Sequence, residues 1–337
     1  MRYIVMIIAT GIFLSSCKNN NLAPDVSKIP VVLSTERYEE DFFSLDSATL
    51  QEGLKKLTAK YPAFQNNFIY TILNVDPRWP ADSALNYLKG FIGAYRPVFD
   101  SSQKVFADFT PYEKEIKKAL QYLKYYFPDY KAPKKIITYI GPLDGFGDIL
   151  DEEHFIVGLH QHLGKNFSLY GTAWVSQTYP AYITERFTPE YISVNAMKNI
   201  ISDLYPEKPE DKSLLLQMVE KGKRLYLLQK LLPETQEYKL IGYTVKQLKE
   251  SYSHEAAIWN LFTQNNFLQI IDNNLIKNYI GESPKTQELG ESAPGNIGSF
   301  AGWQIVKKYM DKFPDTNLKA LMVMDAEKLF NEAKYKP

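Results

Sequence analysis

The chain has 337 residues, of which 45% are hydrophobic and 23% are charged. These are ordinary values for a globular protein, and they exclude a disordered, collagenous or coiled-coil chain. Lys and Arg together number 39, as do Asp and Glu, so no net positive field is available to hold a polyanion. The charge balance therefore argues against nucleic acid as the main partner.

The first sixteen residues are predicted to be a lipoprotein signal peptide. Arg2 supplies a positive charge, and residues 3–13 form an apolar run that is too short to span a bilayer as a helix. The segment Leu14-Ser15-Ser16-Cys17 resembles the bacterial lipobox, in which the cysteine is acylated and becomes the new N-terminus. Cys17 is the only cysteine in the sequence. Lipidation would consume a thiol that would otherwise meet an oxidising compartment.

Residues 17–30 are predicted to be the lipidated cysteine and a flexible tether, because residues 18–30 are polar, hold two prolines and show no periodicity. No stretch rich in Pro, Gly or Ser divides residues 31–337 into independent parts. We therefore expect one compact domain over residues 31–337.

Amphipathic patterns predict helices over residues 49–60 and 83–95. The clearest helix start lies at Thr110 to Glu113, which we interpret as a capping box with Pro111 at the first helical position. Behind it, apolar side chains recur at helical spacing until Pro128 ends the helix: Ile116, Leu120, Leu123 and Phe127.

Two β-branched runs bounded by Gly or Pro, residues 135–140 and 155–162, predict strands. The loop between them, residues 141–153, contains three Gly and five acidic residues. Further helices are predicted over residues 189–204, 213–232, 245–267, 273–280, 297–310 and 318–332. A capping box formed by Thr244 and Gln247 precedes the third of these. The proportions indicate a predominantly helical α+β protein with a small central sheet.

The sequence holds four histidines: His154, His160, His162 and His254. On a strand, His160 and His162 would point to the same face about 7 Å apart. That spacing can chelate zinc if a third ligand comes from elsewhere. His154 would lie about 20 Å away along the strand, so the third ligand would have to be His254 or a carboxylate. Without a second spaced ligand pair, we favour surface or hydrogen-bonded histidines on an edge strand over a metal site.

His254 and Glu255 match the first two positions of the HExxH motif of zinc peptidases, but Ile258 occupies the position of the second histidine. Glu255 falls on a helix face whose other members are mostly apolar: Leu248, Tyr252, Trp259 and Phe262. A carboxylate among such side chains needs either a raised pKa or a partner. We favour a structural glutamate bonded to the backbone or to a tyrosine hydroxyl over a catalytic acid.

A run of small residues begins the apolar segment 293–310. Gly298 and Gly302 lie four positions apart on one helix face, so they would admit another backbone closely, either within the core or at a partner. No nucleotide-binding loop and no serine-nucleophile motif is present in the sequence. We therefore predict no catalytic residue, metal ligand or cofactor.

An ordered set of short motifs resembles the gliding-motility-associated lipoprotein GldB family of the Bacteroidetes and covers nearly all of the mature chain. After the lipobox, the set comprises residues 36–46, 60–64, 125–128, 156–159 with 163–164, 221–223 with 225–226, 241–244, 254–255 with 258–259, 293–295 with 297–298, 302–306 with 309–310, and 334–337. The order and spacing of these motifs carry the resemblance, because none of them is diagnostic alone.

The resemblance implies a cell-envelope lipoprotein that is needed for surface gliding and, through the same machinery, for type IX secretion. It also implies distant kinship to predicted zinc-dependent proteases, and hence a zincin-like relative that lacks the metal motif. The helix over residues 189–204 would be the counterpart of the HExxH helix, although its segment 194–199 contains no histidine. Glu220 would correspond to the third metal ligand. The family has no established catalytic residues to carry over.

These observations favour a non-catalytic lipoprotein that is anchored to membrane lipid through Cys17 and acts through protein partners in the gliding and secretion apparatus. Two alternatives stay open. One is a zinc-dependent hydrolase built from His160 and His162 with Glu220 or Glu255. The other is an envelope lipoprotein that binds glycans through its 24 Tyr and 4 Trp. The segment after Cys17 lacks an acidic run, which favours an inner- or outer-membrane anchor that faces the periplasm.

Overall fold

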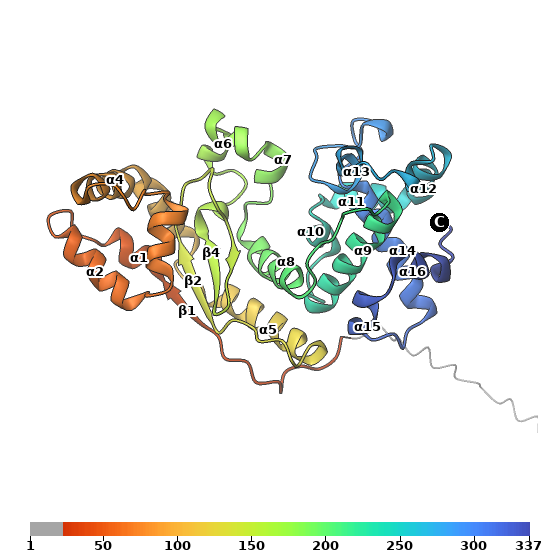
Figure 1. The fold of residues 1–337 in the computed structure, drawn as a ribbon, viewed down its shortest axis with the longest axis horizontal. Helices are drawn as coiled ribbons and strands as arrows, with labels where there is room; N and C mark the ends of the chain where they lie inside the picture. The colour runs from red at the N-terminus through yellow and green to blue at the C-terminus, as the bar shows by residue number, and fades with distance from the viewer. Residues whose placement is uncertain (1–22) are drawn as a thin grey trace, which may run out of the picture.

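A computed structural model describes residues 23–337, and Figure 1 shows their arrangement. The predicted signal peptide and Cys17 lie outside these described residues. This described part of the chain is mainly helical and holds one small sheet, at the left of Figure 1, which confirms the predicted α+β class. Within residues 23–337, no helix combines the length and the apolar character needed to cross a membrane.

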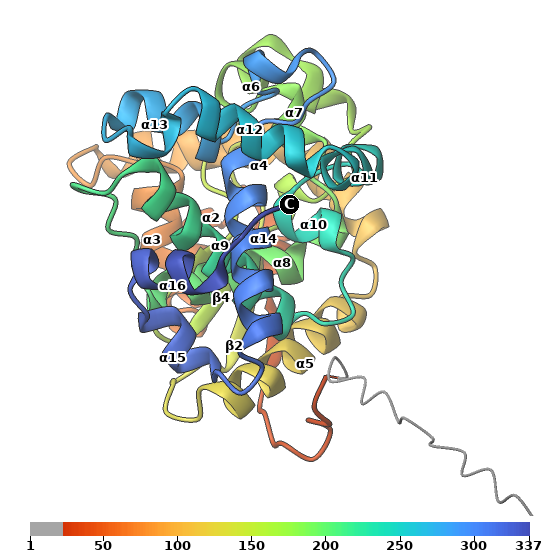
Figure 2. The same cartoon turned by 90° about the vertical axis from the view of Figure 1, so that its right-hand side faces the viewer.

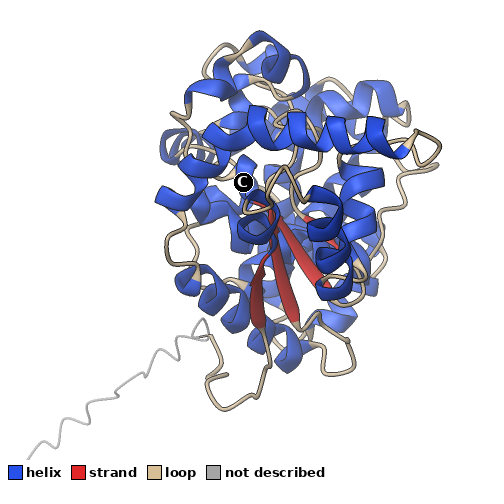
Figure 3. Ribbon diagram, turned by 90° about the vertical axis from the view of Figure 1, so that its left-hand side faces the viewer, coloured by secondary structure: helices blue, strands red, loops and turns tan. Residues whose placement is uncertain are grey.

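The sheet consists of β1 (Ser34–Arg37), β2 (Lys135–Tyr139), β3 (Ile149–Leu150) and β4 (His154–Gly158). The strand order is β1-β2-β4-β3, with β1, β2 and β4 parallel and β3 antiparallel to β4. Ser34 pairs with Lys135, which in turn pairs with His154. All of β4 and all but the first residue of β2 are buried. Such burial is typical of parallel strands that helices cover, as Figure 3 shows.

The N-terminal helices are α1 (Tyr38–Phe43), α2 (Leu50–Lys60), α3 (Phe64–Asn67) with a π-helical turn (Phe68–Ile72), α4 (Ala81–Val105) and α5 (Thr110–Tyr126). Aromatic rings fill the space between α1, α3 and the sheet. The ring of Tyr38 lies 4.8 Å from that of Phe64 and 4.9 Å from that of Phe68, both in edge-on contact. This aromatic core fixes α1 and α3 against one another.

The remaining helices are α6 (Ala173–Thr178), α7 (Ala181–Thr184), α8 (Ile192–Leu204), α9 (Leu214–Leu231), α10 (Glu237–Ile241), α11 (Val245–Ser253), α12 (Glu255–Gln264), α13 (Asn273–Ile280), α14 (Ile297–Lys312), α15 (Leu318–Val323) and α16 (Ala326–Ala333). Turns of 3-10 helix cover Leu159–Gln161, Ser168–Gly171, Pro189–Tyr191, Phe267–Gln269 and Gln287–Leu289. Figure 2 shows α14 crossing the C-terminal half, with α9, α15 and α16 beside it.

Helices α9 and α14 approach so closely that their backbones touch. A Cβ atom on Gly302 would lie 1.8 Å from the carbonyl oxygen of Met218, and one on Gly222 would lie 2.2 Å from that of Gly302. Only a residue without a Cβ fits at either position. The close approach expected at Gly298 and Gly302 therefore occurs within the core of the chain.

Of the two capping boxes predicted at helix N-termini, one is confirmed and one is wrong. Thr244 and Gln247 form the predicted reciprocal capping box, with hydrogen bonds of 3.1 and 2.9 Å. The capping box predicted at Thr110 is wrong, because Asp108 accepts the hydrogen bond from the Thr110 backbone N–H at 2.9 Å. The Glu113 carboxylate instead accepts a hydrogen bond from the Thr35 hydroxyl at 2.7 Å.

Two of the predicted helices are divided. The segment 245–267 breaks at His254 into α11 and α12, and the segment 318–332 breaks before Asp325 into α15 and α16. Asp325 begins the second of these by accepting a hydrogen bond from the Lys328 backbone N–H. The buried Lys223 ammonium group donates to the carbonyl oxygens of Met322 and Met324, which stabilises the end of α15.

The end of the segment predicted as a tether lies on the folded body. Val26 is buried, and the carbonyl oxygens of Ile29 and Pro30 accept hydrogen bonds from Gln121 and Lys124 of α5, each at 3.0 Å. From Val26 onward, the chain is thus attached to α5 rather than extended away from it.

Candidate functional site

His160 and His162 follow β4 and do not lie on it. The strand ends at Gly158, and Leu159–Gln161 form a 3-10 turn. The strand predicted over residues 155–162 is therefore wrong beyond Gly158, and so is the placement of both imidazole rings on one strand face. The strand ends at Gly158 because its backbone N–H donates a hydrogen bond to a side chain ten positions earlier in the sequence. The acceptor is the Asp148 carboxylate, at 3.1 Å.

The His160 ring is buried with both nitrogen atoms engaged. Its Nδ1 accepts a hydrogen bond from the Gly141 N–H at 3.0 Å, and its Nε2 lies 3.0 Å from the carbonyl oxygen of Phe146. Because a carbonyl oxygen only accepts, the ring carries its proton on Nε2 and is neutral. Burial lowers the pKa of His160 to about 4. This histidine therefore fixes the loop that follows β2.

The His162 ring is equally buried but faces two acceptors. Its Nδ1 lies 3.1 Å from the carbonyl oxygen of Thr188, and its Nε2 lies 2.8 Å from the carboxylate of Asp148. This arrangement fits an imidazolium ion that donates from both nitrogens to a carbonyl and a carboxylate. Burial alone would lower the pKa of His162, but the Asp148 charge and the hydrogen bonds to Asp148 and Thr188 together outweigh burial and raise it. Burial would raise the pKa of Asp148, but the His162 charge and the hydrogen bonds from His162, Asn195 and Gly158 together outweigh burial and lower it.

Helix α8 completes the hydrogen bonds of Asp148. The Asn195 amide donates to the Asp148 carboxylate at 2.8 Å, and the Asn199 amide donates to the Asp148 backbone oxygen at 3.3 Å. These two asparagines lie one helical turn apart, at the spacing that two histidines have in HExxH. In this chain the helix thus presents two amide donors to a carboxylate.

Glu220 and Glu255 lie apart from the histidines. The Glu220 carboxylate lies 2.9 Å from the ammonium nitrogen of Lys223. Glu255 accepts a hydrogen bond from the Tyr335 hydroxyl at 2.7 Å, the kind of structural contact that we favoured for it. Over residues 23–337, no three His, Cys, Asp or Glu side chains gather in a way that could hold a metal ion.

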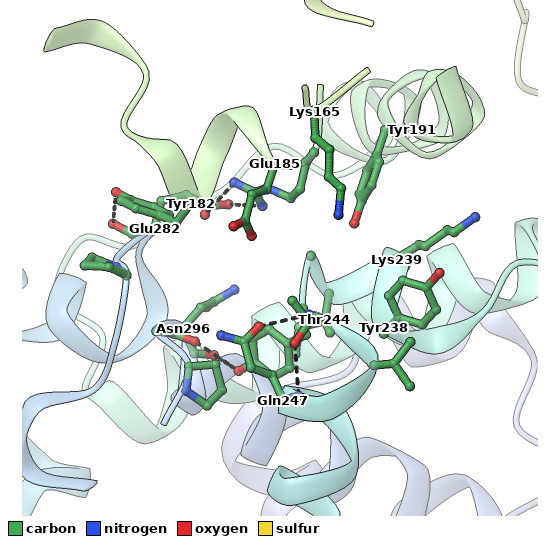
Figure 4. A pocket seen from close by; sticks show the side chains of 18 of the residues that line it. Lys165, Tyr182, Glu185, Tyr191, Tyr238, Lys239, Thr244, Gln247, Glu282 and Asn296 are labelled. Carbon is green, nitrogen blue, oxygen red and sulfur yellow. Dashed lines mark hydrogen bonds and ion pairs between the residues drawn. The ribbon is translucent and has the colours of Figure 1, made fainter. Parts of the chain in front are cut away.

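A cleft of about 370 Å³ lies between the segment around α7 and the segments that precede α11 and α14. Figure 4 shows Lys165, Glu185 and Tyr191 on one side of the cleft and Tyr238 and Gln247 on the other. Lys165 and Glu185 are exposed and take part in no ion pair with any residue of the range 23–337. Their charges are therefore free to contact a ligand.

An ion pair bridges the cleft at one end. The Arg186 guanidinium group binds the Glu282 carboxylate through two hydrogen bonds, of 3.0 and 2.8 Å. Burial, together with the nearby Arg186 charge, lowers the pKa of Lys198 on α8 to about 8. Four tyrosines line the remainder of the cleft: Tyr182, Tyr191, Tyr238 and Tyr243. Tyrosine and arginine beside mixed charges are typical of surfaces that bind proteins.

The sequence matches the model of the lipoprotein family described as gliding motility protein GldB, over residues 19–337. The chain belongs to the GldB family. This confirms the family resemblance, and with it a role in gliding motility and an envelope location with a lipid anchor. The match includes the histidine network and the cleft alike. No curated protein and no solved structure is significantly similar to this GldB-family chain. Kinship to zinc-dependent proteases therefore stays a prediction.

Sequence reasoning alone missed the centre of the buried network in this GldB-family protein. Asp148 lies in the loop that was noted for its five acidic residues, but no local pattern distinguishes it from the other four. Its partners Gly158, His162 and Asn195 are 10, 14 and 47 positions away. The cleft was missed for the same reason, because its walls come from segments on both sides of α8 and α9.

Proposed function

We propose that this protein supports gliding as a lipid-anchored envelope protein that acts through protein contacts and catalyses no reaction. We further propose that the same contacts serve type IX secretion. Membership of the GldB family carries the proposal. Acylated Cys17 would attach the chain to the membrane, with residues 31–337 on the periplasmic side.

The cleft between α7 and α11 supports a protein partner. Its tyrosine rings offer large contact area at low entropic cost, and its unpaired charges of both signs can orient a polypeptide segment. The hydrogen bonds of His160 and His162 support a structural role for these two histidines, since each ring already uses both of its nitrogens.

Deletion of the gene tests the proposal in cells. We expect the deletion strain to stop gliding and to secrete type IX substrates poorly, because one apparatus would lose the same contact in both processes. Gliding of single cells and secreted protein in the medium are the two measurements. A deletion strain that glides and secretes normally would remove the functional assignment.

Charge reversal in the cleft tests where the partner binds. Lys165→Glu combined with Lys239→Glu should leave the melting temperature unchanged and fail to restore gliding in the deletion strain. A photo-crosslinking residue at Glu185 should capture a protein that the double variant no longer captures. Lys89→Glu on α4 and a crosslinker at Glu52 on α2 are the matched controls, since both positions are exposed and lie outside the cleft.

Metal analysis separates this proposal from the hydrolase alternative. We expect the purified mature protein to contain no stoichiometric zinc, because the lone pairs that would bind the ion are occupied in both His160 and His162. About one zinc per chain, lost on changing both histidines to alanine, would favour the hydrolase instead. Retention on immobilised peptidoglycan or glycan, lost on changing the cleft tyrosines, would favour the glycan receptor.

A further inference from the structure

Lysines without acidic partners gather at one edge of the molecule. Residues 110–135 contain seven lysines against three acidic residues, although the whole chain is balanced at 39 against 39. Some lysines here are neutralised, since Lys118 pairs with Glu234 and Lys135 pairs with Glu36. Other exposed lysines here form no ion pair with any residue of 23–337, and we name five of them the basic face: Lys28, Lys117, Lys124, Lys131 and Lys134.

Contacts within the chain bring the members of the basic face together. The hydrogen bonds from Gln121 and Lys124 to the carbonyl oxygens of residues 29 and 30 hold Lys28 against α5. Lys117 lies one helical turn before Gln121, and so on the same side of α5. Lys124, Lys131 and Lys134 line one shallow depression of about 620 Å³.

Apolar side chains are interspersed with these lysines. Val32, which lines the same depression, is 75% exposed, and Tyr125 on α5 is 51% exposed. Glu152 and Glu153 also line the depression, so with Lys135 neutralised by Glu36 its lining retains a small excess of positive charge: three unpaired lysines against two acids. Exposed lysines beside valine and tyrosine suit a surface that is polar on one side and apolar on the other, as the headgroup region of a bilayer is.

The place where the N-terminal segment leaves the folded body indicates that a membrane covers the basic face. Cys17 precedes Ala23 by six positions, so an acylated Cys17 lies within about 20 Å of Ala23. Figures 1 and 2 both show the segment that begins at Ala23 running along the lower edge beside α5, whereas α6, α7 and α13 lie at the upper edge. The lipid anchor therefore leaves the molecule at the edge that carries the basic face.

We propose that the basic face lies on the bilayer and binds the phosphate groups of anionic phospholipids. The proposal rests on the attachment through Cys17 proposed above, and it adds an orientation to that attachment. A single flexible attachment would leave the body free to tumble, whereas a second, electrostatic contact fixes which edge faces the membrane. Helix α7, at the opposite edge, would then hold its wall of the cleft away from the bilayer.

Vesicle binding by the mature chain carrying Cys17→Ser tests the basic face without the lipid. Each lysine near an anionic surface strengthens binding about fivefold. We expect the protein to bind phosphatidylcholine vesicles that contain phosphatidylglycerol, and Lys131→Gln with Lys134→Gln to weaken that binding about 25-fold. Lys249→Gln with Lys277→Gln, on α11 and α13, should bind as the unchanged chain does. Equal binding by the two double variants, or no preference for phosphatidylglycerol, would overturn the proposal.

The lipidated mature protein provides a second measurement. In phosphatidylglycerol vesicles, an amine-reactive reagent should modify Lys131 and Lys134 more slowly than Lys249 and Lys277, and pure phosphatidylcholine should abolish the difference. Equal rates in both kinds of vesicle would refute the orientation, and so would protection that appears only in whole cells, since a protein would then cover the face. Membrane attachment that persists in these cases would leave the Cys17 anchor and the gliding role standing.

Discussion

His160 and His162 stand two positions apart, yet their partners hold them in opposite protonation states. For His160, the folded pKa is about 4 against 6.5 for an unperturbed histidine. Between these values the unfolded chain binds a proton that the folded chain does not. The His160 contribution is therefore fully present above pH 6.5 and is lost as the pH falls toward 4, by up to about 3 kcal/mol.

His162 contributes in the opposite direction. Its folded pKa is raised above 6.5, so the folded chain holds a proton that the unfolded chain releases. This contribution is fully present below pH 6.5 and is lost as the pH rises through the folded pKa. The carboxyl group of Asp148, whose pKa is lowered, contributes above its ordinary value of 3.8 and stops contributing in stronger acid. Together, the two histidines place maximal stability near pH 6.5.

Urea unfolding of His160→Gln and His162→Gln over a pH series checks these signs. The first variant should lose part of the decrease in stability between pH 6.5 and 4, and the second should lose the decrease above pH 6.5. Each variant is the control for the other, because both remove a buried imidazole from the same segment and only the pH dependence is compared. If both variants lost the pH dependence of the unfolding free energy on the same side of pH 6.5, the assigned protonation states would be contradicted.

At the scale of the secondary-structure elements, the contact between helices α9 and α14 depends on two glycines, Gly222 and Gly302. Gly302→Ala should lower the free energy of unfolding by about 3 kcal/mol or more, because a methyl group meets the Met218 carbonyl and the helices must separate. Gly90→Ala on α4 is the matched control, since nothing lies within 4 Å of its added Cβ. There alanine should stabilise the protein by about 0.5–1 kcal/mol through helix propensity.

Thermal unfolding of the two alanine variants measures the difference. A Gly302→Ala chain that melts with the unchanged protein would mean that α14 is not packed against α9 as described. If such a chain also failed to restore gliding, the small-residue face would instead contact a partner.

Elements defined by local signals were predictable from the sequence, and elements defined by distant partners were not. The helix Asn273–Ile280 and the Thr244 cap were foreseen in full, because apolar spacing and capping residues are local. Strand β1 was missed since Ser34–Arg37 has no buried alternation and forms only by pairing with β2. The break before Asp325 had a local signal, its N-cap side chain, but the apolar spacing continues through it.

The candidate site was less predictable for the same physical reason. His160 and His162 were expected to be surface or hydrogen-bonded histidines on an edge strand. Both are hydrogen-bonded, but they are buried and lie beyond the strand, because a continuous β-branched run hid the turn that begins at Leu159. The Asp148 carboxylate, which accepts the hydrogen bond at the end of β4, is separated from His162 by β3 and β4, and α8 brings in Asn195 from further along the chain. Only tertiary structure decides which of the loop acids becomes the buried partner.

At the scale of the whole molecule, we expect Cys17, which lies outside the described range, to connect the chain to the membrane. Cys17→Ser should give a precursor that is not processed, takes up no labelled palmitate and moves to the aqueous phase on detergent partitioning. Ser16→Thr, which keeps the cysteine, is the control for the signal sequence. Palmitate labelling that survives in the Cys17→Ser chain would show that the anchor is elsewhere.

The pairing of β1 with β2 also determines when the chain can fold as it leaves the ribosome or the translocation channel. Ser34 pairs with Lys135, 101 positions later, so the strand nearest the anchor has no neighbour until about a hundred further residues have emerged. At about 5–20 residues per second, that wait is about 5–20 s. An unpaired strand is a template for association between chains. The nascent protein should therefore depend on chaperones most strongly during this interval, and fragments that end before Lys135 should aggregate.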